Sequence, residues 1–206
     1  MKIRRILFIA PLAVTAGLLF AAPAAAQDGE VALVIGALLG DDVDIATSEV
    51  TRGFDNSPLY GGRAGIYGHP WGFEGSVVLS PSGLADVEES GPGTAPFDVR
   101  VIYAEANVLL IPIPGPVSPF VTGGIGIHSF KFDDAGIDIT ENQLGFNFGG
   151  GIKGDLGAVG LRLDVRDHLT PFDPDDVDPL LIPILGLTDS KTLHNWEISG
   201  GVSINF

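Results

Sequence analysis

The last segment of the chain, residues 195–206, alternates strictly between apolar and polar side chains. One set contains Trp196, Ile198, Gly200, Val202, Ile204 and Phe206, and the other contains Asn195, Glu197, Ser199, Gly201, Ser203 and Asn205. Successive side chains of a β-strand point to opposite faces, so the pattern predicts a strand with one apolar and one polar face. Any fold of this chain must therefore bury that apolar face away from water, in a protein core or in lipid.

The same alternation recurs through the rest of the chain. It predicts eight strands, at 29–39, 61–69, 71–80, 98–111, 119–132, 141–153, 158–168 and 192–206. Most of them are close to the roughly 9–11 residues that a tilted strand needs to cross a membrane. The 29 glycines argue against helices, because each costs about 1 kcal/mol in a helix interior.

The connections between these strands alternate in length. Residues 68–71, 112–118 and 154–157 form short turns, 40–60, 81–97 and 169–191 form long loops, and 133–140 is intermediate. Short turns at one end and long loops at the other are typical of outer-membrane barrels. Most prolines fall in these connections or at strand limits, where no ladder hydrogen bond is lost. We therefore predict an all-β, eight-stranded antiparallel up-and-down transmembrane β-barrel, with both termini at the short-turn end.

The N-terminus predicts export. A basic start, an apolar stretch and a small-residue cleavage site follow one another at Lys2–Arg5, Ile6–Phe20 and Ala24–Ala26. We expect residues 1–26 to be a signal peptide that is cleaved after export through the Sec pathway, and residues 27–206 to form the barrel. A transmembrane anchor is the alternative, but Pro11 interrupts the apolar stretch.

Composition excludes several classes of function. The net charge of −15 disfavours nucleic acid as a partner, because binding phosphates requires clustered Lys and Arg. The absence of cysteine excludes a disulfide framework and a thiolate metal site. Beyond the N-terminal segment, no run of about 20 apolar residues could cross a membrane as a helix.

Four stretches carry a family resemblance: Gly201–Phe206, Phe120–Ile127, Gly145–Ile152 and Gly160–Arg166. With them, residues 28–206 resemble the small outer-membrane β-barrel family of OmpA/OmpX type. The resemblance implies a place in the outer membrane of a Gram-negative bacterium, in contact with lipid and lipopolysaccharide. It also implies that Phe206 and its strand form an assembly signal for the barrel-assembly machinery.

The predicted interior carries charges of both signs. Turning the apolar faces outward sends inward Glu30, Arg63, Glu74, Glu105, Lys153, Arg162, Asp164, Arg166 and Glu197. Eight strands enclose a space that side chains can just fill, so we expect a network of ion pairs that blocks a wide channel. The alternative is that several charges lie unpaired in wet mouths. The interior glycines Gly124, Gly126 and Gly149 leave room for larger neighbours.

Outside the barrel, aromatic residues predict the membrane boundary. Trp71, Phe73 and Phe206 are expected in the aromatic girdle on the periplasmic side, and a soluble core is the alternative.

No motif predicts catalysis or a cofactor. Gly149–Gly154 matches G-x-G-x-x-G, but it lies in an alternating strand rather than before a helix. His128 and Ser129 are adjacent in a strand, so they face opposite sides and cannot form one dyad. His168 and His194 are expected at the loop rim, with Asp167, Asp189 and Ser190 near in sequence, an arrangement too loose for a triad. We therefore predict no catalytic, cofactor or metal residues.

The long loops are acidic. Their carboxylates are Asp41, Asp42, Asp44, Glu49, Asp55, Asp86, Glu88, Glu89, Asp133, Asp134, Asp138, Asp173, Asp175, Asp176 and Asp178. They suit calcium or divalent bridging to lipopolysaccharide phosphates, but a solvated acidic surface that resists aggregation is the favoured interpretation.

Taken together, these features predict a monomeric, non-enzymatic structural or surface-interaction protein. A narrow pore for ions or small solutes is the alternative, and a lipid A-modifying enzyme is a third hypothesis. An apolar interior would instead favour the carriage of apolar solutes.

Overall fold

The computed structural model describes residues 28–40, 42–44, 51–53, 56–83, 98–134, 137–173 and 190–206. The predicted signal peptide lies outside this part. Eight long strands form the fold: β1 (Asp28–Leu39), β4 (Ser57–Tyr67), β5 (Trp71–Gly83), β6 (Asp98–Leu110), β7 (Val117–Asp134), β8 (Ile137–Asp155), β9 (Val159–Phe172) and β10 (Lys191–Asn205). Two further strands, β2 (Asp42–Asp44) and β3 (Thr51–Gly53), pair with each other in the first long connection.

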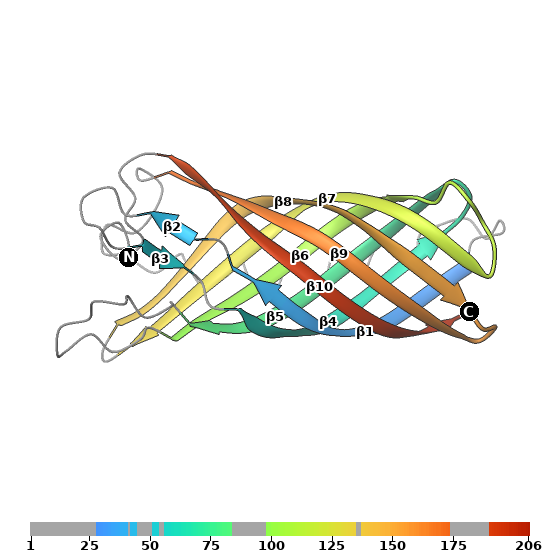
Figure 1. Ribbon diagram of the computed structural model, residues 1–206, viewed down its shortest axis with the longest axis horizontal. Helices are drawn as coiled ribbons and strands as arrows, with labels where there is room; N and C mark the ends of the chain where they lie inside the picture. Colours follow the sequence, from blue (N-terminus) through green and yellow to red (C-terminus); the bar gives the residue numbers. More distant parts are fainter. Residues whose placement is uncertain are drawn as a thin grey trace, which may run out of the picture.

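The eight long strands close into a barrel in the order β1-β10-β9-β8-β7-β6-β5-β4 (Figure 1). Every neighbour is antiparallel, and β1 closes the sheet against β10 in a register that pairs Val31 with Ile204. At the end of this seam, Gly29 and Phe206 exchange two main-chain hydrogen bonds of 2.8 Å. Closure leaves no strand edge in the hydrocarbon, where unpaired amide groups are costly. The eight-stranded antiparallel barrel predicted from the sequence is confirmed.

Three details of the prediction were wrong. The connection expected at 133–140 is mostly strand, because β7 and β8 pair outward as far as Asp134 and Ile137. The first long connection contains the β2–β3 pair, which is too short to give a sequence signal. Pro58, Pro81 and Pro171 lie inside β4, β5 and β9 rather than in loops. Each is close to the strand's long-loop end, where a lost hydrogen bond costs least.

The outward side chains form an apolar surface. Trp71, Phe73 and Phe206 are 55%, 54% and 78% exposed, as a lipid-facing position requires. Leu33, Ile125, Leu161 and Val202 continue this surface on other strands. The part of the chain that the structure describes contains no helix long and apolar enough to cross a bilayer.

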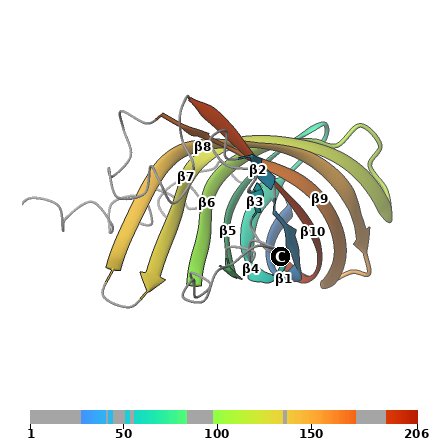
Figure 2. The ribbon, with the colours of Figure 1, turned by 60° about the vertical axis from the view of Figure 1, so that its left-hand side comes forward.

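Within the part of the chain that the structure describes, one stretch of β8 pairs with a neighbouring strand on one side only. The ladder between β8 and β9 reaches only to Phe146 and Leu169, whereas β8 stays paired with β7 to its first residue. Two residues beyond Leu169 on β9 lies Pro171, which has no amide hydrogen to donate. We call residues 137–145 of β8 the outer edge; Figure 2 shows this end of β8 beside β7 and β6.

Candidate functional site

All nine charged residues predicted to point inward do so. Eight are buried: Glu30, Arg63, Glu74, Glu105, Arg162, Asp164, Arg166 and Glu197. The side chain of the ninth, Lys153, is 15% exposed. The alternation of side chains along a strand was enough to place them, because every second residue of a strand points to the same face.

The centre of the interior is a network of arginines and carboxylates. Glu74 accepts hydrogen bonds from Arg162 Nη1 at 2.8 Å and Arg166 Nη2 at 2.7 Å. Asp164 accepts two from Arg162, at 2.9 Å and 3.0 Å, and one from Arg166 at 3.0 Å. Arg63 pairs with Asp164 at 2.6 Å and also with Glu197. These contacts join strands β4, β5, β9 and β10 across the barrel, so the charges are mutually paired.

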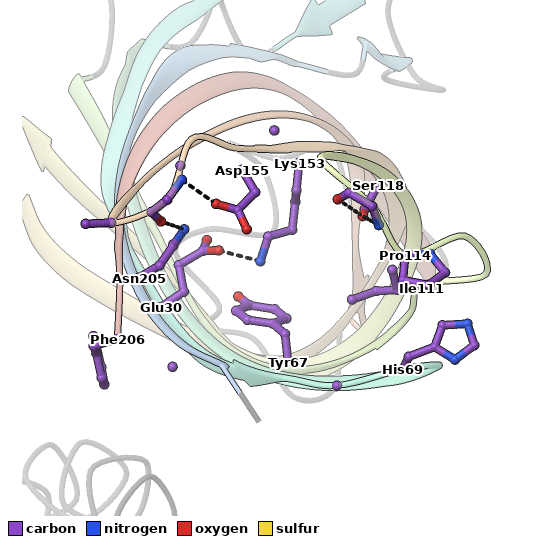
Figure 3. Close-up of a pocket in the computed structure, with 17 residues that line it drawn as sticks. Glu30, Tyr67, His69, Ile111, Pro114, Ser118, Lys153, Asp155, Asn205 and Phe206 are labelled. Carbon is purple, nitrogen blue, oxygen red and sulfur yellow. Dashed lines mark hydrogen bonds and ion pairs between the residues drawn. The ribbon is translucent and has the colours of Figure 1, made fainter. Parts of the chain in front are cut away.

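Toward the short turns, the network ends at a cavity of about 700 Å³ (Figure 3). Its inner wall contains Glu30, whose carboxylate lies 2.5 Å from Lys153 Nζ and 3.3 Å from Arg162 Nη1. Lys153 Nζ also lies 3.1 Å from the centre of the Tyr67 ring. Lys153 and Arg162 are opposite each other in the β8–β9 register. Glu30 therefore neutralises two cations that would otherwise repel each other.

Toward the long loops, the network continues into a layer of histidines that was not predicted from the sequence. His168 was expected at the loop rim, but both His168 and His128 are completely buried in the interior. Glu105 Oε1 lies 3.1 Å from His128 Nε2 and 2.8 Å from His168 Nδ1. Tyr103 stacks on the His168 ring with 4.2 Å between centroids. The alternation of side chains could have placed both rings inside. His128 is two residues from Gly126 and His168 is two residues from Arg166, and both of those residues were predicted to face the interior.

This layer contains a hydroxyl, an imidazole and a carboxylate in contact. Thr170 Oγ1 lies 2.7 Å from His128 Nδ1, and the other nitrogen of that ring faces Glu105. The three residue types match those of a hydrolytic triad. All three are buried among side chains, however, and the cavity described above is lined by other residues. The hydrogen bonds hold the imidazole in place, away from the residues that line the described cavity.

The interior next to the long loops is apolar, which the assignment of apolar faces to lipid did not anticipate. The buried cluster there consists of Val34, Leu38, Leu59, Val78, Val99, Val101, Tyr103, Phe130, Phe132, Phe172 and Leu193. Phe130 and Phe172 rings pack edge to face at 5.3 Å. Strand β1 shows why the assignment failed, because it is apolar on both faces at this end. We call this group the outer cluster; it fills the barrel as a protein core does.

The remaining predicted positions do not converge on a site. His194 lies on the outward face, where its Nδ1 is 2.8 Å from Asp167 Oδ2. Ser190 donates to Asp173 rather than to either histidine. Gly149–Gly154 lies within β8, without a helix to bind a dinucleotide. The side chains of the acidic loop residues, apart from Asp173, lie outside the described part of the chain.

Comparison with protein families gives one match. The sequence profile described as outer membrane protein beta-barrel domain matches residues 12–206. The chain belongs to this family. Membership of this family places the protein in the outer membrane of a Gram-negative bacterium. A comparison with curated proteins finds no match.

Solved structures of small outer-membrane barrels resemble the fold of this family member. Neisserial surface protein A aligns with a TM-score of 0.58 at 13% identity, over 87% of this chain and 97% of its own. A major outer membrane protein from Thermus thermophilus aligns with a TM-score of 0.52 at 16% identity, over 88% of this chain and 100% of its own. At these identities the likeness shows the fold alone.

Proposed function

We propose that this protein is a closed outer-membrane barrel with a structural or surface-interaction role, and that its long connections are its functional surface. The observation that carries the proposal is the network of arginines and carboxylates across the interior. A conducting channel needs a continuous path for water. Here the middle of that path is occupied by side chains that bind each other.

Electrostatics supports a permanent closure rather than a gate. Separating Arg162 or Arg166 from its carboxylates would leave an uncompensated charge away from bulk water, a change that costs about 3–5 kcal/mol in buried ion pairs. Arg166 is entirely buried, and Glu74 and Asp164 both bind it. Opening would have to break several such contacts at once.

The outer cluster is a second, independent reason to expect that the barrel interior is closed. Phe130 and Phe132 are 0% and 1% exposed, so the apolar section next to the long loops is filled by its own side chains. A carrier of apolar solutes would need space among these residues. The described cavity lies instead at the short-turn end, beside Glu30 and Lys153.

A narrow pore is the second candidate, and that cavity is the observation that favours it. Planar-bilayer recording of the refolded protein distinguishes the two, with heat-modifiable gel mobility as proof of folding. We expect no unitary current steps from the folded wild-type barrel. Steps of constant size from the wild type would overturn the closed-barrel proposal and would assign the interior charges to ion selectivity.

A paired substitution tests whether the network is the barrier. Replacing Glu74 and Arg166 together by serine removes opposite charges and leaves polar space in the interior. Because the outer cluster still fills the section next to the long loops, we expect no current steps from this variant, as from Asp155→Asn, which changes an exposed carboxylate beside the cavity. Current steps from the folded double variant would show that the charged network alone closes the barrel.

We further propose the partners that this role implies. Outer-membrane lipid and lipopolysaccharide surround the apolar wall, and the barrel-assembly machinery recognises the strand that ends at Phe206. The acidic connections bind divalent cations, which would reduce their repulsion from lipopolysaccharide phosphates. The functional unit is a monomer, because one chain closes the sheet without leaving a seam to be filled by a second copy.

A further inference from the structure

Three strands bring three metal-binding side chains together inside the barrel. Glu105 comes from β6, His128 from β7 and His168 from β9. One donor atom from each lies within 4.8 Å of the other two. All three side chains are essentially without exposed surface. The proposed function uses their packing inside the barrel but not their capacity as ligands.

The two imidazoles are aimed at one point. His128 Nε2 and His168 Nδ1 both form hydrogen bonds to the same atom, Glu105 Oε1, at 3.1 Å and 2.8 Å. An imidazole binds a metal along the direction in which its nitrogen donates or accepts a hydrogen bond. The ligand axes of both rings therefore converge on one carboxylate oxygen, and small ring rotations would direct them to an ion bound beside it.

The opposite nitrogen of each ring also has a partner. His128 Nδ1 lies 2.7 Å from Thr170 Oγ1, and His168 Nε2 lies 3.1 Å from Glu197 Oε2. Histidine ligands of metals commonly donate their second N–H to an oxygen, which fixes the ring orientation. Both rings already have such an oxygen in place.

We propose that Glu105, His128 and His168 form a binding site for a divalent transition metal of the zinc class. Two imidazoles and one carboxylate suit zinc, whereas calcium and magnesium prefer oxygen ligands alone. Zinc–ligand distances of about 2.0–2.1 Å place the donors of a tetrahedral site about 3.3 Å apart. The two nitrogen–oxygen distances fit this spacing after shifts of a few tenths of an ångström.

Metal binding has a simple proton balance. Without metal, both nitrogens of His168 face carboxylate oxygens, so both donate and the ring is an imidazolium. The metal takes the lone pair of His168 Nδ1, and that proton leaves to solvent. The proton on His128 Nε2 moves to Nδ1, which then donates to Thr170 while Nε2 binds the metal. One proton is released for each divalent ion, and no electron is transferred.

The site joins β6, β7 and β9, so the bound ion would act as a cross-link between them. Because the trio is buried between the charged network and the outer cluster, the ion enters while the barrel folds. Refolding must therefore be carried out with the metal present.

The test is to refold the full chain with Co²⁺ or Zn²⁺, remove free metal, and analyse the heat-modifiable form. We expect about one ion per folded barrel and a visible Co²⁺ absorption of tetrahedral intensity. His128→Gln should abolish both signals. Thr170→Val should weaken binding by about 10–100-fold through loss of the hydrogen bond to the ligand. His194→Gln is the matched control, since its ring lies outside the barrel, and it should bind as the wild type does.

A folded wild-type barrel without bound metal would overturn the proposal. Equal metal content in the wild type and a folded His128→Gln variant would overturn it as well, because the ion would then be elsewhere. Should His128→Gln fail to fold, the wild-type spectrum and the Thr170→Val affinity still decide. None of these results depends on whether the barrel conducts.

Discussion

Neutralising Glu74 tests the central network most directly. In the Glu74→Gln variant, the side chain keeps its size but loses its charge. Arg162 then keeps Asp164 and Glu30 as partners. Arg166 keeps Asp164 as its ion-pair partner, at 3.0 Å, and its Nε and Nη1 atoms already lack a hydrogen-bond partner. Arg166 is therefore the group that the substitution leaves poorly compensated.

We expect the free energy of unfolding to fall by about 3–5 kcal/mol, the usual cost of removing one partner of a buried ion pair. The loss exceeds that of a neutral hydrogen bond, about 1 kcal/mol, because a charge is left behind. Adding Arg166→Met to Glu74→Gln should recover part of the loss, since the second substitution removes that charge.

Equilibrium urea unfolding in lipid vesicles can measure this loss through the two tryptophans. Trp71 and Trp196 are 55% and 45% exposed on the lipid-facing wall, so their fluorescence reports transfer from lipid to water. Asp155→Asn is the control, because its exposed oxygen accepts a hydrogen bond from Gly157 N that an amide oxygen can also accept. A loss below about 1 kcal/mol in Glu74→Gln would refute the reasoning, because water or a shifted side chain would then compensate Arg166.

Three further substitutions test other parts of the interior. Gly145→Ala should lower the free energy of unfolding by about 1–3 kcal/mol, because the added methyl group would overlap the His128 ring. Gly62→Ala is the comparison, since its methyl group would meet nothing closer than 3.7 Å, and the unfolding midpoints of the two variants show the difference. Removing the hydroxyl in Tyr103→Phe should cost about 1–3 kcal/mol in the same assay, since a buried asparagine amide loses its acceptor. Deleting Phe206 removes two closing hydrogen bonds, so the heat-modifiable fraction in cells should fall; an unchanged fraction would exclude a role in closure or assembly.

The sequence predicted the barrel and its charged interior because both depend on local rules. Alternation in β9 and β10 assigns Arg162, Arg166 and Glu197 to the inside without knowledge of any distant residue. Connection lengths then give the pairing of neighbours. These rules specify whether a side chain faces the interior or the lipid, but not how far along the barrel axis it lies.

The positions of residues along the barrel axis, which the local rules do not give, explain what was not predicted. Leu38 and Phe130 were not separated from lipid-facing residues, because an apolar side chain suits both lipid and a packed interior. His168 was taken as a rim residue because its strand was expected to end at residue 168, whereas β9 continues to Phe172. The contact of Glu105 with two histidines depends on the stagger of three strands, which no local pattern encodes.

The outer edge of β8 sets a limit on how deeply the barrel is immersed. Among the described residues, 137–145 have no ladder partner on the β9 side, so their main-chain amide groups on that side need water or other polar groups. Hydrocarbon can therefore reach no further than about Phe146 along this strand. The nine residues beyond it span roughly 30 Å at about 3.3 Å each. These residues carry β8 beyond the hydrocarbon, toward the side of the long connections.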